Sequence, residues 1–225
     1  MPPSRRRATA AVFADPKPPK PPSGVDIAKA DPEPEGSYQR LAYYDVDLSG
    51  RETESVRFTQ CRFRAADLSG ARLDQVSLTD CLVQNSNWAN LTSDGGTLTR
   101  VELRDSRMTG LTIADGVLRD VRAEECRLDL SAWRFTRFEA VHFIGCNFTG
   151  ADFTGADLRG ARFTRCDLSG VQLHQADLTG TRFRSSTLAG IGSPAQLRGA
   201  VFPESDLPAL SFVLAAAMGI TIADT

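Results

Sequence analysis

The residues best suited to chemistry in this sequence are its five cysteines and two histidines. The cysteines recur in steps of twenty residues within two groups: Cys61 and Cys81, then Cys126, Cys146 and Cys166. No Cys-x-x-Cys pair occurs, so we expect buried thiols that act as small apolar residues in a reducing cytoplasm. His142 and His174 alone leave little material for acid–base or metal chemistry. The sequence therefore predicts no metal site.

Two short segments resemble ligand-binding motifs but lack a feature that each chemistry requires. Residues 45–50 (DVDLSG) resemble the start of a calcium loop, but Val56 stands at the twelfth position, where a bidentate glutamate is needed. Residues 190–195 (GIGSPA) loosely match a dinucleotide fingerprint without its strand–helix–strand context. The serines have no paired base. We therefore expect neither enzymatic activity nor a cofactor.

The element that must position these residues is a repeat of five. Every fifth residue from Tyr43 to Leu188 gives 30 positions, of which 27 are large and apolar. The column two residues earlier, from Leu41 to Ser186, is mostly small and contains all five cysteines. Across both columns only Arg51 is charged. This period fits neither a helix nor a flat strand, and it predicts a solenoid with two inward residues and a turn in every repeat.

The spacing of like residues indicates that four repeats form one coil. The cysteine groups and the glycines at positions 50, 70, 110, 150, 170 and 190 keep a common step of twenty. Four repeats per coil would stack like residues on like. At about 4.8 Å per stacked strand, the body would form a rod roughly 36 Å long.

At this point the sequence resembles the pentapeptide repeat family, whose motif is a small residue, Asp or Asn, Leu or Phe, and two polar residues. The segments that match most closely are 66–70 (ADLSG), 151–155 (ADFTG), 156–160 (ADLRG) and 176–180 (ADLTG). The resemblance implies an all-β fold, a right-handed quadrilateral parallel β-helix with four repeats per coil. Residues 82–140 depart from the motif, although both core columns continue through them. We assign residues 38–203 to this β-helix.

The first 37 residues differ from the body. They hold nine of the twelve prolines and all three lysines, with too few apolar residues to offset the entropy of ordering them. We expect residues 1–37 to be a disordered, solvated tail in which residues 16–22 favour polyproline II. A PxxP ligand for a partner domain is the alternative for this segment.

Residues 204–225 are predicted to contain a capping α-helix, because a bare solenoid end would expose core and strand edge. Ser205 is expected to cap a helix that runs to about Met218 and stops at Gly219. One stripe would cover the rod: Leu207, Leu210, Leu214 and Met218. Apolar residues off the stripe suggest a second partner, and some family members dimerise through such a helix. The expected homodimer interface is Leu210, Phe212, Val213 and Leu214.

With no active site expected, function should lie on the outer faces. The formal net charge of −2 excludes a nucleic-acid binder that works through bulk positive charge. No apolar run reaches the roughly 18 residues of a membrane span. Under four-fold winding two neighbouring faces are acidic, one is rich in arginine and the fourth is balanced. The candidate binding residues are Asp47, Glu52, Glu54, Asp67, Asp74, Asp94, Asp115 and Asp152.

Two hypotheses follow from these faces. The chain resembles the quinolone-resistance branch of the family, whose rods imitate duplex DNA toward DNA gyrase or topoisomerase IV and so protect against quinolones or a toxin. A rod of roughly 36 Å spans about one duplex turn. Its charge is lower, because duplex DNA carries one charge per about 1.7 Å. The alternative is a non-enzymatic structural scaffold whose faces bind another protein.

Overall fold

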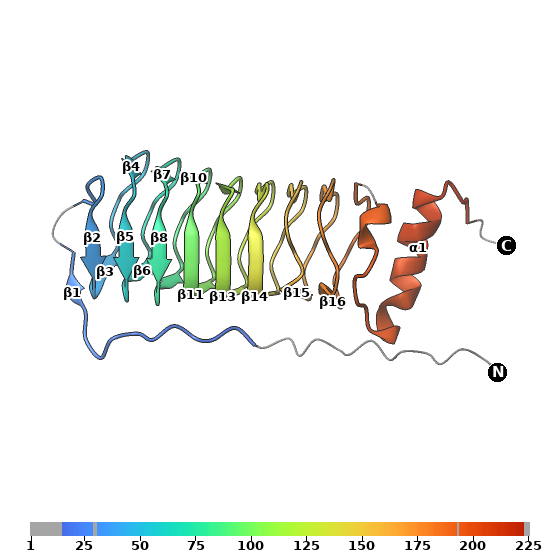
Figure 1. Ribbon diagram of the computed structural model, residues 1–225, viewed down its shortest axis with the longest axis horizontal. Helices are drawn as coiled ribbons and strands as arrows, with labels where there is room; N and C mark the ends of the chain where they lie inside the picture. Colours follow the sequence, from blue (N-terminus) through green and yellow to red (C-terminus); the bar gives the residue numbers. More distant parts are fainter. Residues whose placement is uncertain (1–14, 29–30, 193, 223–225) are drawn as a thin grey trace, which may run out of the picture.

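The computed structural model describes residues 15–28, 31–192 and 194–222. The body is a rod of stacked coils, with one helix across its C-terminal end (Figure 1). Neighbouring strands pair in parallel with a register offset of twenty residues, as in Leu78↔Leu98 and Leu98↔Leu118. Between residues 41 and 190 the chain contains no helix. The predicted quadrilateral β-helix with four repeats per coil is therefore confirmed.

Each coil contributes one short side to each of four faces, which we name by their charge or pairing. The neutral face contains β2 (Ser37–Gln39), β5 (Arg57–Thr59), β8 (Ser77–Thr79) and the first halves of β11 (Thr97–Arg104), β13 (Val117–Glu124) and β14 (Arg137–Ile144). The basic face contains the second halves of these three strands, with β3 (Leu41–Tyr44), β6 (Arg62–Arg64), β9 (Leu82–Gln84), β15 (Ala161–Thr164) and β16 (Arg182–Arg184).

The two remaining faces are more lightly paired. The acidic face is the four-stranded sheet of β4 (Glu52–Glu54), β7 (Arg72–Asp74), β10 (Thr92–Asp94) and β12 (Thr112–Ala114). The bridge face has single parallel bridges that run from Asp47↔Asp67 to Asp167↔Thr187. The acidic and basic faces lie on opposite sides of the coil, so the molecule is electrically two-sided.

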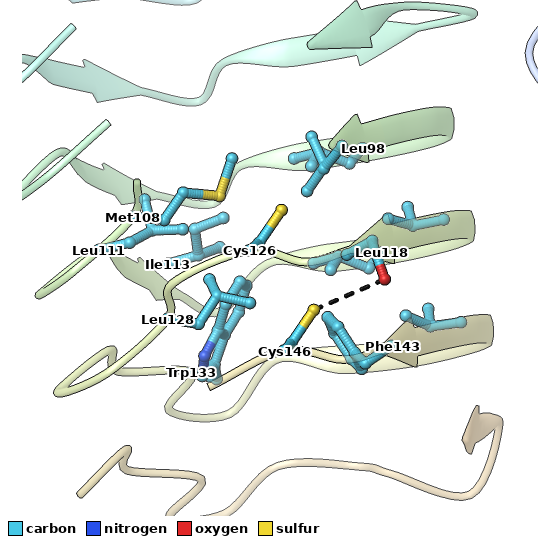
Figure 2. Close-up of a cluster of buried hydrophobic side chains, with 14 of the residues drawn as sticks. Leu98, Met108, Leu111, Ile113, Leu118, Cys126, Leu128, Trp133, Phe143 and Cys146 are labelled. Atoms are coloured by element: carbon cyan, nitrogen blue, oxygen red, sulfur yellow. Dashed lines mark hydrogen bonds between the residues drawn. The ribbon is translucent and has the colours of Figure 1, made fainter. Parts of the chain in front are cut away.

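Both inward columns form the core. The large column is buried at nearly every position, and identical rings stack from coil to coil. Phe143 and Phe163 lie 5.2 Å apart at 18°, and Phe163 and Phe183 lie 5.3 Å apart at 9°. Figure 2 shows Cys126 and Cys146 among the leucines, Met108 and Trp133 of the middle coils, where the motif is weakest. The core columns, and not the motif, therefore keep the coil regular there.

The corners require a left-handed backbone. One residue in most repeats has φ near +50° to +70°, and many of these residues are not glycine. Each left-handed non-glycine residue costs about 1–2 kcal/mol, so the corners need compensation. Ladder hydrogen bonds between coils supply it, as from the Asp80 N–H to the Thr99 carbonyl at 3.0 Å. Short side chains such as Asp and Asn tolerate this conformation best, which explains their frequency at the corners.

The described part of the N-terminal segment differs from the solvated tail that we expected. Residues 15–28 run along the outside of the rod, from its C-terminal coils back to its first coil (Figure 1). The segment ends in β1 (Asp26–Ile27), which pairs with β3 through Asp26↔Leu41. Proline-rich composition predicted the absence of a core, but it could not show that the rod offers hydrogen-bond partners. Residues 1–14 lie outside the described residues.

The repeat shifts its register by one residue at the C-terminal end, where Arg182 bridges Val201 at an offset of nineteen. After the register shift near residue 193, a 3₁₀ turn η1 (Pro194–Leu197) leads to Phe202, which stacks on Phe183 at 4.9 Å. A second 3₁₀ turn η2 (Glu204–Asp206) precedes α1 (Leu207–Ala217), and Gly219 follows with φ of +70°. Ser205 is not the cap: no side chain caps α1, and the Ser205 hydroxyl instead contacts Asp206.

The side of α1 that faces the rod also differs from the prediction. The Ser185 N–H donates to Asp206 Oδ2 at 2.6 Å, and this contact sets the rotation of the helix. Asp206, Ala209, Leu210 and Val213 consequently line the narrow space above Phe202. Leu207 and Met218, which we expected to cap the core, are 53% and 76% exposed. The residues of α1 that cover the rod end thus lie about one position from the predicted stripe, because η2 sets the rotation at which the helix starts.

Candidate protein-binding faces

The acidic face brings four of the predicted residues together. Glu52 and Glu54 lie on β4, Asp74 on β7 and Asp94 on β10, all at the N-terminal half of the sheet. Glu54 pairs in register with Asp74, and the Asp94 N–H donates to Asp74 Oδ1 at 3.1 Å. Arg72 is the only cation on these three strands, and its Nε lies 2.7 Å from Asp74 Oδ2. The result is an exposed carboxylate ladder on a short sheet.

The other predicted acidic residues are not part of this ladder. Asp47 and Asp67 lie on the bridge face, where each Oδ1 accepts the N–H of the serine two residues later at 2.9 and 2.8 Å. Hydrogen bonds from those serines hold the pKa of both carboxyls below the usual range. Asp152 lies five coils from Glu52 and pairs with Arg134 at 2.6 Å. Asp115 is exposed at a corner beside the acidic face.

The basic face is neutralised in its middle and positive toward its C-terminal end. Arg104 pairs with Glu102 and Glu124, and Arg122 also pairs with Glu124. Further along the rod, a pocket of about 360 Å³ is lined by residues that include His142, Arg162, Phe183 and Arg184. Burial, with Arg162 and Arg122 nearby, lowers the pKa of His142 to about 4, so this imidazole is neutral at pH 7.

Within the described residues, the metal-ligating side chains do not gather into a cluster. No three His, Cys, Asp or Glu side chains of that part of the chain come close enough together to hold a metal ion. The five cysteines are buried and form no disulfide, as predicted. A hydrogen bond with Cys146, together with burial, raises the pKa of Cys126 far above the ordinary thiol value. The neutral thiol is therefore the favoured form of Cys126.

Sequence reasoning missed one set of polar residues, which lies where the strands of the neutral face end. Gln60, Asp80, Arg100 and Asp120 stack at one corner; Gln60, Asp80 and Asp120 contact the N-terminal segment, and Arg100 pairs with Asp80. The signal that could have found them is the spacing of Asp80 and Asp120, which are 40 residues apart and therefore on one ladder. The segment itself repeats Lys-Pro-Pro twice at residues 17–22.

The family profile described as pentapeptide repeats matches eight copies, at residues 44–81, 134–170, 146–184 and 166–190. The chain belongs to the pentapeptide repeat family. The unmatched stretch between residues 82 and 133 forms coils in the same register, since β11 and β13 pair at the twenty-residue offset. Proteins of this family are generally non-enzymatic structural or protein-binding proteins. Among curated proteins, no sequence relative is found.

Several solved structures resemble the rod at low identity. QnrB1, a plasmid-mediated fluoroquinolone resistance protein, is 17% identical, with 88% of this chain and 96% of that chain covered and a TM-score of 0.37. HetL from the cyanobacterium Nostoc sp. strain PCC 7120 is 17% identical over 75% of this chain and 89% of its own, with a TM-score of 0.22. Likeness at this level carries no argument about function. No helix among the described residues is long and apolar enough to cross a bilayer.

Proposed function

We propose that this pentapeptide repeat protein is a non-enzymatic rod that binds a basic surface of a partner protein through its acidic face. The carboxylate ladder of Glu54, Asp74 and Asp94 supports this proposal. Like charges side by side on neighbouring strands destabilise a sheet by roughly 0.2–1 kcal/mol per pair, so the fold gains nothing from them. Solubility would be served equally well by the mixed charges found at Arg104 and Glu124 on the basic face.

The finer proposal is that the acidic face imitates one side of a duplex toward DNA gyrase or topoisomerase IV. Glu52, Glu54 and Asp94 are exposed and form no ion pair with any described residue, so their charge is available to a partner. The rod is roughly as long as one duplex turn. Mimicry would involve the acidic and bridge faces, because the opposite basic face carries arginine ladders.

A supercoiling assay with purified gyrase, with and without a quinolone, tests the finer proposal. We expect the wild-type protein to change gyrase activity at micromolar concentration, with an effect that weakens steeply as salt rises. The double variant Glu52→Arg with Glu54→Arg should abolish the effect. Arg64→Glu with Arg184→Glu on the basic face is the matched control and should preserve it.

Two results would redirect the proposal. If the wild-type protein leaves gyrase unchanged at micromolar concentration, DNA mimicry toward gyrase is wrong, and a scaffold that binds another protein remains. If reversal on the basic face abolishes binding and reversal on the acidic face does not, the arginine face is the contact surface.

We also propose that two rods associate through the outer side of α1. From Leu207 to Ile222 the chain contains no charged residue. The structure leaves Phe212 and Leu214 exposed, at 59% and 41%, while Leu210 and Val213 lie against the rod end. An apolar helix with one side uncovered requires a partner, and a second copy offers a self-complementary surface. Phe212 and Leu214, together with Leu207 and Met218, would form that contact.

A further inference from the structure

Residues 15–22 (DPKPPKPP) lie in extended conformation along one corner of the rod (Figure 1). This corner separates the neutral face from the basic face. Its side chains come from successive coils, and we name Gln60, Asp80, Arg100 and Asp120 the corner ladder. Arg62 and Arg162, which lie beside it on the basic face, also contact the segment.

Every backbone N–H that the segment offers between residues 16 and 22 is bound. Five of these seven residues are prolines, so only Lys17 and Lys20 have an N–H to donate. The Lys17 N–H donates to Asp120 Oδ1, and the Lys20 N–H donates to Asp80 Oδ1, both at 3.0 Å. The pairing leaves no backbone donor of this stretch without an acceptor.

The two accepting carboxylates are nearly buried at the corner of the rod. Asp80 and Asp120 are only 7% and 9% exposed. Arg100 lies between them and holds Asp80 with two hydrogen bonds, of 2.6 and 2.8 Å. A carboxylate that is buried this far needs partners for its oxygens, and here the segment provides them. Arg100 thus orients the Asp80 carboxylate independently of the segment.

Further contacts fix both ends of the segment. The Gln60 side-chain amide donates to the Lys20 carbonyl at 2.9 Å, and Arg62 donates to the Pro22 carbonyl at 3.3 Å. At the other end Arg162 Nη2 lies 2.7 Å from Asp15 Oδ1. These contacts hold the chain to one direction along the rod.

The repeat of the segment matches the repeat of the rod. A polyproline II helix advances about 9.3 Å in three residues, and two coils of stacked strands advance about 9.6 Å. Lys17 and Lys20 are three residues apart, and Asp120 and Asp80 are two coils apart. The same period appears in burial, since Pro16, Pro19 and Pro22 are half-buried while Pro18 and Pro21 are exposed.

We propose that the corner ladder is a recognition site for a polyproline II peptide that carries a backbone N–H at every third residue. Residues 15–22 of the same chain are its resident ligand. Because two coils equal one turn of the peptide, the spacing of Asp80 and Asp120 selects this period, and both lysines are exposed. A peptide of the same spacing supplied in trans binds the site when the resident segment is displaced.

The first test uses the full chain labelled with ¹⁵N-lysine, which reports only Lys17, Lys20 and Lys29. We expect the Lys17 and Lys20 amides to exchange with solvent at least tenfold more slowly than in a free peptide of residues 15–24. Asp120→Ala should remove the protection of Lys17. Asp105→Ala, an aspartate with the same left-handed backbone at another corner, is the control and should not. Exchange of both amides at the free-peptide rate in the wild type would overturn the proposal.

The second test separates N–H recognition from lysine charge. The receptor is the full chain with Lys17→Pro and Lys20→Pro, in which the resident segment has lost both donors, and the probe is a fluorescent peptide with the natural sequence of residues 15–24. We expect saturable binding to this variant and at least tenfold weaker binding to the wild type, whose site is occupied.

Two altered probes complete this experiment. A peptide with both lysines changed to alanine keeps the N–H groups and should bind within about threefold of the natural one. A peptide with both changed to proline keeps the polyproline II conformation and should bind at least tenfold more weakly. Equal binding of the proline peptide, or no saturable binding of the natural peptide up to millimolar concentration, would show that the ladder is not such a site.

Discussion

At the scale of single residues, His142 is a titratable group whose surroundings oppose its charge. It is half-buried on the basic face, and its Nε2 lies 2.9 Å from the Thr164 hydroxyl. Burial, then Arg162 and Arg122, lower its pKa from 6.5 to about 4. The unfolded chain therefore binds a proton below about pH 6.5 that the folded chain does not accept until about pH 4.

This difference predicts how stability depends on pH. As pH falls from 6.5 toward 4, the free energy of unfolding should decrease, and the whole of this decrease should be reached below about pH 4. His142→Gln should reduce that decrease, and His174→Gln, on the exposed opposite face, is the matched control. Urea unfolding of the wild type and the two variants at pH 7 and pH 4.5 measures this change in the free energy of unfolding. An identical pH dependence in wild type and His142→Gln would contradict the assignment.

The buried thiols lead to a second prediction at this scale. Cys146 is 1% exposed, and its pKa is raised to about 12, so native protein should react slowly with a thiol reagent and fully after denaturation. Cys146→Arg should destabilise the fold by several kcal/mol, because it buries a charge without a partner. Cys146→Ala is the matched control and should cost far less. Rapid labelling of the native protein would show that the coils open near this residue.

At the scale of elements, α1 separates two roles by its two sides. Val213 packs against the core at the rod end, whereas Phe212 is exposed on the other side. Val213→Arg should lower the melting temperature, because it removes the cap from Phe202 and leaves the rod end in contact with water. Phe212→Arg should leave the melting curve cooperative and convert the proposed dimer to a monomer. Sedimentation of both variants and the wild type at micromolar concentration distinguishes the two roles, and a monomeric wild type would rule out pairing.

The coil could be predicted from sequence because its signal is repeated in every repeat. Thirty copies of one inward column outweigh local exceptions such as Thr53 or Ser93. The side that α1 presents to the rod could not, because one contact between Ser185 and Asp206 sets it. The docked segment was missed for a related reason: its partners, Asp80 and Asp120, are outward residues of the repeat and resemble ordinary solvated charges in the sequence.

For the acidic candidates too, the repeat determines some features and individual neighbours determine others. Glu52, Glu54, Asp74 and Asp94 share a face because coil geometry alone places them there. Whether each carboxylate is free depends on neighbours that the repeat does not specify. Arg134 pairs with Asp152, and Ser69 binds Asp67, so a count of charges per face overstated the acidity available to a partner.

At the scale of the whole molecule, the rod is a one-dimensional stack in which each coil contacts only its neighbours. A step of twenty residues places Phe183 above Phe163, and a step of nineteen, across the register shift near residue 193, places Phe202 above Phe183. Removing a complete coil should therefore preserve every interface type and shorten the rod by about 4.8 Å.

Deletion of residues 167–186 tests this directly. The deletion places Phe202 above Phe163 and brings Asp206 to the backbone N–H of Arg165, which replace the contacts with Phe183 and Ser185. We expect a folded β-helix with cooperative unfolding and a lower melting temperature, because one coil interface is lost. Deletion of residues 167–184 is the control: it moves Leu188 into the position of Gly170, so inward residues would face solvent and the C-terminal coils should unfold. Equal stability of the two deletions, measured by thermal denaturation, would show that the twenty-residue step does not govern the stack.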